Sequence, residues 1–232
     1  MAELIVALDV SSQREVEEAV DRLGETVNFY KIGLELFSAA GPAVVRAVKA
    51  RNKKVFLDLK LHDIPRTVER AVASGAELGV DLMTIHAAGC RAMIRAAADA
   101  SARCGANRPK ILAVTVLTSL DHSDLNDLGI SRTPAQQVEA LGQLAVQNGA
   151  DGIVCSPVEV ARMRSLLGAQ ALLCTPGVRP AGSDAGDQKR IATPGAAVAD
   201  GSTHLVVGRP IMSAADPRAA ALAITAEMLQ GV

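Results

Sequence analysis

The sequence VFLDLKLHDIP occupies residues 55–65 and combines an apolar strand, three charged residues and the start of a helix. Side chains of a strand alternate between its two faces, so Asp58 and Lys60 are predicted to point to one side and the intervening leucines to the other. Asp63 follows where the strand should stop, and Ile64-Pro65 suits the first turn of a helix. A strand that leads straight into a helix is the repeating unit of parallel α/β folds.

The three charges in this stretch indicate a functional site. A buried charge needs a partner, and two acids around one lysine supply it. A structural ion pair that plugs the end of a barrel would also place charges here. Three charges within six residues exceed what such a plug needs, so the pattern favours a catalytic site.

Seven similar units lie on either side of this stretch. The expected strands cover residues 4–8, 29–33, 55–61, 82–86, 110–117, 152–155, 171–175 and 203–207. The expected helices begin after Ser11 or Ser12, after Gly41-Pro42, and at about residues 67, 91, 134, 157, 189 and 217, and residues 121–132 read as a polar loop. Eight alternating strands and helices predict an α/β fold, the (β/α)₈ TIM barrel, as a single domain over residues 1–232. An open dinucleotide-binding sheet would want G-x-G-x-x-G after the first strand, where the chain reads Asp9-Val10-Ser11-Ser12.

Composition narrows the class of protein. Apolar residues make up 49% and aromatic residues only 2%, which suits a core of Ala, Val, Leu and Ile between parallel strands and helices. A net charge of −1 without a basic block argues against nucleic acid as a partner. The apolar runs are too short for a membrane span, and no signal peptide is apparent, so no membrane partner is expected.

The cysteines and histidines show no metal-binding spacing. The four cysteines form no C-x-x-C pair and are expected to be reduced and mostly buried, as in a cytoplasmic protein. The four histidines form no H-E-x-x-H motif, so no metal is predicted.

Polar residues recur at the carboxyl ends of the expected strands, where a TIM barrel carries its active site. Taken singly, each has an ordinary explanation as a cap, a solvated charge or a turn residue, but their convergence on one rim favours function. They are Asp9, Lys31, Asp58, Lys60, Asp63, Thr118, Gly177 with Arg179, and Gly208 with Arg209.

The last two strand ends fit a phosphate. Loops after strands seven and eight of this fold often bind phosphate through backbone N–H groups, and Arg209 adds a cation able to make two parallel bonds. Gly208 permits close backbone approach. The loop from Gly177 to Gln188 is long and rich in small residues, and it is predicted to be a lid that closes over an anion through Arg179 and Gln188.

A lysine between two aspartates is held protonated, because each carboxylate favours the charged form. Such a lysine is a poor Schiff-base nucleophile and a good proton donor. It suits a reaction that generates a carbanion, whose charge the ammonium stabilises. A substrate carboxylate placed against the aspartates would be repelled unless it left as CO₂, although this ground-state argument is contested.

These residues resemble those of the orotidine 5′-phosphate decarboxylase family over nearly the whole chain. The resemblance rests on F-L-D-L-K-L-H-D-I-P-R-T at residues 56–67, T-P-G-V-R-P at 175–180, and V-G-R-P at 207–210. The element D-x-K-x-x-D alone is shared with related sugar-phosphate decarboxylases and synthases. Together with T-P-G-x-R-P and the downstream Gln188 it is specific.

The resemblance implies conversion of orotidine 5′-monophosphate to UMP and CO₂ without a metal or organic cofactor. Lys60 would donate the proton to C6 of the pyrimidine, and Asp58 would lie by the scissile carboxylate. Asp9 and Lys31 would bind the ribose hydroxyls, with Lys31 completing an alternating charge network. Thr118 would contact the pyrimidine, and Pro176 is a further substrate-binding residue. The phosphate side would be bound by Arg179, Gln188, Gly208 and Arg209.

The resemblance also implies a homodimer in which Asp63 and Thr67 reach into the partner's site. One departure is Arg66, where the family commonly has asparagine, and this bears on contacts at the interface. Two alternatives stay open. A metal-dependent sugar-phosphate enzyme of the same barrel group would need an added acidic ligand, for which Glu35 is the nearby candidate; a non-catalytic phosphate-binding barrel would be expected to have lost its charged triplet.

Overall fold

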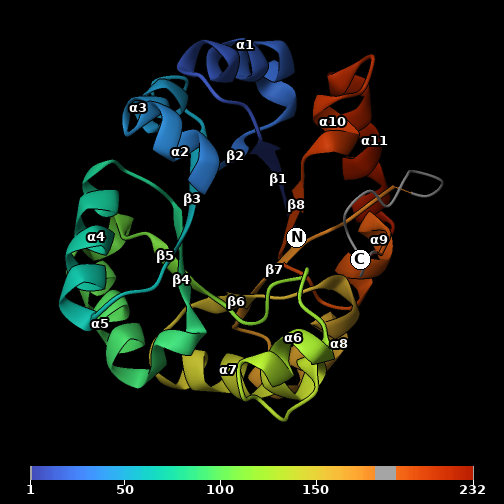
Figure 1. The fold of residues 1–232 in the computed structure, drawn as a ribbon. Helices are drawn as coiled ribbons and strands as arrows, with labels where there is room; N and C mark the ends of the chain where they lie inside the picture. Colours follow the sequence, from blue (N-terminus) through green and yellow to red (C-terminus); the bar gives the residue numbers. More distant parts are fainter. Residues whose placement is uncertain (1, 181–191, 232) are drawn as a thin grey trace.

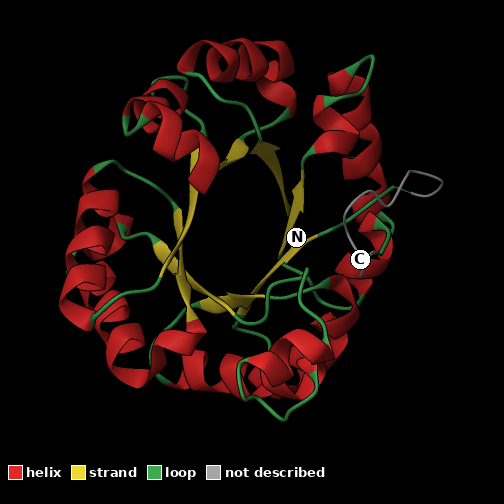
Figure 2. Ribbon diagram, in the orientation of Figure 1, coloured by secondary structure: helices red, strands yellow, loops and turns green. Residues whose placement is uncertain are grey.

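The computed structural model describes residues 2–180 and 192–231, and within them eight parallel strands close into a barrel. The strands form the inner ring and the helices surround it (Figures 1 and 2). Each strand pairs with its neighbours in sequence, and β8 pairs with β1 to close the sheet. The predicted (β/α)₈ barrel is therefore confirmed.

The strands are β1 (Glu3–Leu8), β2 (Phe29–Gly33), β3 (Lys54–Leu61), β4 (Leu82–His86), β5 (Lys110–Val114), β6 (Gly152–Val154), β7 (Leu172–Pro176) and β8 (His204–Val207). The α-helices are α1 (Gln13–Leu23), α2 (Leu34–Ala40), α3 (Ala43–Lys49), α4 (Pro65–Glu77), α5 (Cys90–Ala102), α6 (His122–Asp127), α7 (Pro134–Gln147), α8 (Val160–Leu167), α9 (Pro194–Ala199), α10 (Arg209–Met212) and α11 (Pro217–Leu229). Short 3₁₀ helices cover Gly24–Thr26, Ala87–Gly89, Gly105–Asn107 and Pro157–Glu159. None of the described helices is long and apolar enough to cross a membrane.

Two apolar layers follow from the alternation of side chains along the strands. The outward-facing residues pack against the helices in a large core to which β1 contributes Val6 and Leu8. The inward-facing residues fill the barrel in a smaller cluster, to which β1 contributes Ile5 and Ala7. Because both faces of each strand are covered, the strands read as continuous apolar runs rather than alternating ones.

Several expectations about local structure are wrong. The chain forms α2 directly after Gly33, α6 within the predicted polar loop, and the short α10 after β8, so helices and strands do not simply alternate. Strand β5 ends at Val114 rather than Leu117. Cys155 and Cys174 are buried as expected, but Cys90 and Cys104 are exposed, and all four are free thiols.

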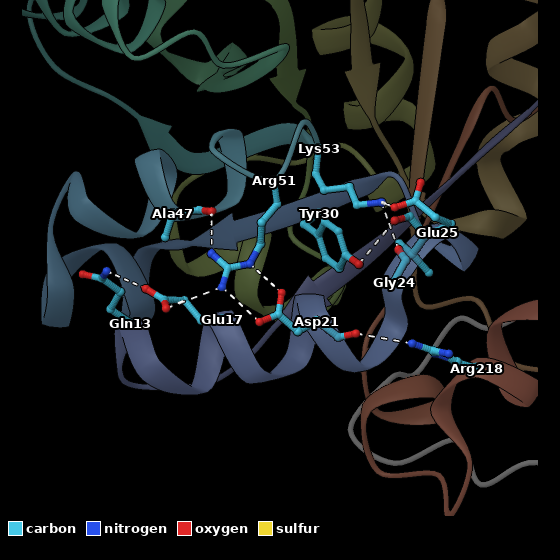
Figure 3. Close-up of polar contacts among 11 residues, drawn as sticks. Gln13, Glu17, Asp21, Gly24, Glu25, Tyr30, Ala47, Arg51, Lys53 and Arg218 are labelled. Carbon is cyan, nitrogen blue, oxygen red and sulfur yellow. Dashed lines mark hydrogen bonds and ion pairs between the residues drawn. The ribbon is translucent and has the colours of Figure 1, made fainter.

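The first and last helices reinforce the closure of the barrel. Arg218, in α11, donates from Nη2 to the carbonyl of Asp21, in α1, at 3.4 Å (Figure 3). The side chain of Asp21 binds Arg51, which follows α3, at 2.6 and 3.0 Å. Gly24, which ends α1, has a φ of 54°, a backbone conformation that favours glycine, and the Arg218 guanidinium lies against it.

Side-chain oxygens clamp the amino-terminal ends of alternate strand pairs. The residue before β4, β6 or β8 accepts a backbone N–H from the preceding odd-numbered strand. The pairs are Val55 to Asp81 at 2.8 Å, Ile111 to Asp151 at 2.8 Å and Leu173 to Thr203 at 2.9 Å. At Asp151 the carboxylate also binds the Arg108 guanidinium, at 2.8 Å through Nη1. This end of the barrel therefore uses its charges to fix the strands.

We expect Asp151→Ala to lower the free energy of unfolding by about 2–4 kcal/mol, because the Ile111 amide and the Arg108 guanidinium lose their shared acceptor. Denaturant titration at neutral pH measures this loss. Glu139→Ala is the matched control, because Glu139 binds Arg162 through two hydrogen bonds on the exposed surface and should contribute little.

The loss of stability in Asp151→Ala should also depend on pH. Burial alone would raise the pKa of Asp151, but the hydrogen bonds from Arg108 and Ile111 outweigh it and hold the pKa below its usual value. A carboxyl with a lowered folded pKa stabilises the fold above the unfolded value, near about pH 4, and loses that contribution as the pH falls through the folded value. The difference between the wild type and Asp151→Ala should therefore shrink on acidification. An unchanged difference at low pH would contradict the charged role.

Candidate active site

The charged residues of β3 meet at the carboxyl end of the barrel. The Asp58 carboxylate, whose side chain is 11% exposed, accepts a hydrogen bond from Lys60 Nζ at Oδ2, at 2.7 Å. A carboxylate this buried would be costly without cationic and hydrogen-bonding partners. The acid and the ammonium, which were predicted to share a face, are in direct contact.

Lys31 and Asp9 extend the pair into a chain of alternating charge. Lys31, the middle residue of β2, has its Nζ 3.9 Å from Asp58 Oδ2 and 3.5 Å from Asp9 Oδ1. The order is therefore Asp9, Lys31, Asp58, Lys60 along the rim. Because β1, β2 and β3 are consecutive parallel strands, their carboxyl ends lie side by side and bring these side chains together.

Strand β3 reaches this geometry through a bulge rather than a regular ladder. Between the pairs Leu57–Met83 and Leu61–Ile85, β3 advances four residues while β4 advances two. Lys60 has a φ of 52°, in the left-handed region that residues with a Cβ rarely adopt. A bulge re-aims the side chains around it, so the contact between Asp58 and Lys60 depends on a feature that simple alternation did not predict.

Thr84, in β4, is a polar partner that the sequence analysis missed. Its hydroxyl donates to Asp58 Oδ1 at 2.9 Å, and it accepts the backbone N–H of Lys60 at 2.8 Å. The side chain is fully buried. A threonine within an apolar run reads as a β-branched core residue, and nothing in its spacing marks it as part of the site.

A cavity of about 190 Å³ opens beside the charged chain. Five of the predicted site residues line it, namely Lys31, Asp58, Lys60, Thr118 and Pro176. The remaining lining is largely apolar and comprises Phe56, Val114, Val116, Leu117, Val154, Cys155, Cys174 and Val206. Such a cavity excludes water from one side of a planar apolar ligand while presenting an ammonium at its edge.

The predicted phosphate residues lie at the ends of β7 and β8. Arg209 is exposed and begins α10, and a Cβ on Gly208 would lie 3.1 Å from Asp9 Oδ2, so a glycine fits where β8 approaches β1. Arg179 is buried, and its backbone N–H donates to the carbonyl of Ala192 at 3.0 Å. Gln188, and the part of the predicted lid beyond Pro180, lie outside the described residues.

Asp63 and Thr67 do not line the cavity of their own chain. Both are exposed, and the Asp63 carboxylate accepts the backbone N–H of Ile64 at 2.7 Å. Every residue from 62 to 67 is exposed, including Ile64 at 67%. This run forms a partly apolar projection beside the rim.

Two neighbouring groups are kept neutral by their surroundings. Burial, followed by the charges of His62 and Lys60, lowers the pKa of His86, whose ring centroid lies 5.5 Å from that of His62. Burial, followed by the charge of Asp58, raises the pKa of the Cys174 thiol. The charges of the site are therefore those of its lysines and aspartates.

Among residues 2–180 and 192–231, no group of three or more His, Cys, Asp or Glu side chains is arranged to hold a metal ion. Glu35, the acidic ligand that a metal-dependent alternative would use, is exposed on α2. The arrangement as described offers an ammonium fixed by carboxylates at the edge of an apolar cavity. It can deliver a proton to a carbon atom and stabilise negative charge that develops there.

Comparison with known proteins agrees with this geometry. Residues 2–224 match the model of the "Orotidine 5'-phosphate decarboxylase / HUMPS family". Orotidine 5′-phosphate decarboxylase of Rhodopseudomonas palustris (strain HaA2) is 52% identical over 227 residues, covering 98% of this chain and 94% of that protein. The enzyme of the same name from Moorella thermoacetica is 50% identical over 230 residues, covering 97% and 91%.

A solved structure is similar over the same length. The crystal structure of orotidine 5′-phosphate decarboxylase from Lactobacillus acidophilus superposes with a TM-score of 0.88 at 40% identity, covering 98% of this chain and 99% of the other.

Proposed function

We propose a mechanism for this chain, which belongs to the orotidine 5′-phosphate decarboxylase / HUMPS family. It is an orotidine 5′-phosphate decarboxylase, which converts orotidine 5′-monophosphate to UMP and CO₂ in pyrimidine biosynthesis. The observation that carries the proposal is the 2.7 Å contact between Lys60 Nζ and Asp58 at the edge of the apolar cavity.

Lys60 acts as the proton donor. As the bond between C6 and the carboxylate breaks, its electron pair remains on C6 and CO₂ departs. The Lys60 ammonium stabilises this carbanion and delivers its proton to C6, which gives UMP. Asp58, which is itself paired with Lys31, holds the ammonium in place before the reaction, so little reorganisation is needed as charge develops.

Asp58 faces the leaving carboxylate and keeps Lys60 charged. Repulsion between the two carboxylates is relieved when CO₂ leaves, but the main catalytic term in this proposal is stabilisation of the carbanion by Lys60. The pyrimidine occupies the cavity, which Thr118 and Pro176 help to line. Asp9 and Lys31 bind the ribose hydroxyls.

The phosphate lies at the ends of β7 and β8. Arg209 and the backbone around Gly208 bind it, and Arg179 and Gln188 contribute from the loop between β7 and α9. The exposed Arg209 side chain supports this assignment, because a guanidinium can bind a phosphate through two parallel hydrogen bonds. Binding energy from this remote group is used to hold the pyrimidine against Lys60.

We further propose that the chain works as a homodimer in the cytoplasm. Asp63 and Thr67 complete the partner's site, and the exposed run of residues 62–67, with Ile64 at its centre, supports an interface there. Arg66 lies in this run and binds Glu69 at 2.8 Å, so it is placed to alter contacts across the interface. The four free thiols suit a reducing compartment.

Lys60→Ala is expected to lower kcat by more than about a thousandfold, because the proton donor and the counter-charge of the carbanion are both lost. The loss of absorbance on adding orotidine 5′-monophosphate measures turnover, with and without a chelator. The fold should survive, since Asp58 keeps Thr84 and Lys31 as partners. Turnover near that of the wild type would overturn the mechanism, and activity of the wild type abolished by the chelator would favour the metal-dependent alternative.

Arg209→Ala is expected to raise KM about 10- to 100-fold, because a charged hydrogen bond to the phosphate is lost. Orotidine, which has no phosphate, is the control substrate, and its slow turnover should be unaffected. Equal damage to both substrates would show that Arg209 does not act through the phosphate.

Sharing of sites between subunits is tested by mixing two impaired variants. Lys60→Ala and Asp63→Ala each damage both sites of their own homodimer. A heterodimer of the two has one intact site, with Lys60 from one chain and Asp63 from the other. Random assortment of an equal mixture should restore about a quarter of wild-type activity. If mixing after subunit exchange restores none, Asp63 does not serve the partner's site.

A further inference from the structure

Thr84 makes two hydrogen bonds that join the members of the proposed catalytic pair. Its Oγ1 lies 2.9 Å from Asp58 Oδ1 and 2.8 Å from the backbone nitrogen of Lys60. A hydroxyl has one proton to donate and two lone pairs to accept with, so one side chain satisfies both bonds at once. The residue is fully buried, which fixes the hydroxyl between β3 and β4.

The bond to the Lys60 amide replaces one that a regular ladder would have supplied. Around Lys60 the register of β3 against β4 shifts, and the Lys60 φ of 52° turns its N–H away from the usual pairing. The Thr84 hydroxyl accepts that N–H instead. An unusual backbone conformation persists only where its surroundings hold it, and the Thr84 hydroxyl is one such constraint.

The hydrogen bond from Thr84 gives the two carboxylate oxygens of Asp58 different partners. Oδ1 is held by Thr84, whereas Oδ2 lies 2.7 Å from Lys60 Nζ and 3.9 Å from Lys31 Nζ. With Oδ1 fixed, the carboxylate cannot turn to bind Lys60 through both oxygens. The orientation of Asp58, and with it the position of the ammonium, therefore depends on a side chain of the neighbouring strand.

We propose that Thr84 is a positioning residue for decarboxylation, because its hydroxyl fixes both the Asp58 carboxylate and the Lys60 backbone. The proposal rests on the proposed roles of Asp58 and Lys60. The described residues that line the cavity do not include Thr84, so it acts through these two residues rather than on the substrate. Small errors in the placement of a proton donor lower the rate of the chemical step steeply.

The expected effect falls on catalysis rather than on binding. The proposed phosphate contacts lie at the ends of β7 and β8, and the hydrogen bonds of the Thr84 hydroxyl go to Asp58 and the Lys60 backbone rather than to the ribose-binding residues Asp9 and Lys31. Loss of the hydroxyl should therefore lower kcat while KM and the affinity for the product UMP stay almost constant. A residue needed only for folding would instead lower the amount of active enzyme or weaken binding and catalysis together.

The experiment compares Thr84→Val, which removes the hydroxyl and keeps the shape, with Thr84→Ser, which keeps the hydroxyl. We expect Thr84→Val to lower kcat about 10- to 100-fold with KM within about threefold of wild type. Thr84→Ser should recover most of kcat. Thr203→Val is the matched control, because its hydroxyl also accepts a neighbouring strand's N–H, that of Leu173 at 2.9 Å, but at the opposite end of the barrel.

The outcomes separate this proposal from the mechanism on which it rests. If Thr84→Val keeps the kcat of the wild type while Lys60→Ala does not, the positioning role is wrong and the mechanism stands. If Lys60→Ala itself keeps wild-type turnover, the mechanism fails first. Equal losses of kcat in Thr84→Val, Thr84→Ser and Thr203→Val, in proportion to their losses of thermal stability, would also overturn the positioning role.

Discussion

Backbone pairing of β8 with β1 is the contact on which the rest of the structure depends. It runs from Glu3 opposite His204 to Val6 opposite Val207, and it turns an open parallel sheet into a closed ring. Closure places the end of β8 against the end of β1, where Gly208 leaves room for Asp9. The same closure brings the proposed phosphate site and the charged chain to one rim, although nearly 200 residues of sequence separate Asp9 from Gly208. Outside the sheet, α11 and α1 hold the seam through Arg218.

The charged side chains at the rim compensate one another, because each of them would be costly to bury alone. Asp58 is buried at the edge of an apolar cavity, and two lysines and a threonine hydroxyl compensate its charge. The lysines are in turn held by carboxylates, so the chain from Asp9 to Lys60 is already ordered before a substrate arrives. An electrostatic site that is ordered in advance spends little energy on reorganisation during the reaction. The opposite end of the barrel uses similar residue types, at Asp151 and Arg108, to fix the strands.

Most of the fold was predictable because the strands are continuous apolar runs and the helices carry clear periodicity. Helix α2 was missed since it follows Gly33 without a side-chain cap, and α6 since its residues are polar although Asp121 caps it. In the site, charged residues at strand ends stood out against apolar neighbours. Thr84 did not, because a buried threonine is an ordinary strand residue and its importance arises from the bulge in β3. That bulge is a relation between two strands, which a local pattern does not contain.

The side-chain hydrogen bonds at the amino-terminal ends of the strands affect the entropy of folding. Asp81, Asp151 and Thr203 each fasten a strand to the one just before it in sequence, so these contacts close short loops. The entropy lost on closing a loop grows with its length. Among the described strands, only β1 and β8 pair across almost the whole chain. The seam between β1 and β8 thus closes the longest loop and carries the largest loop-closure entropy among these strand pairs.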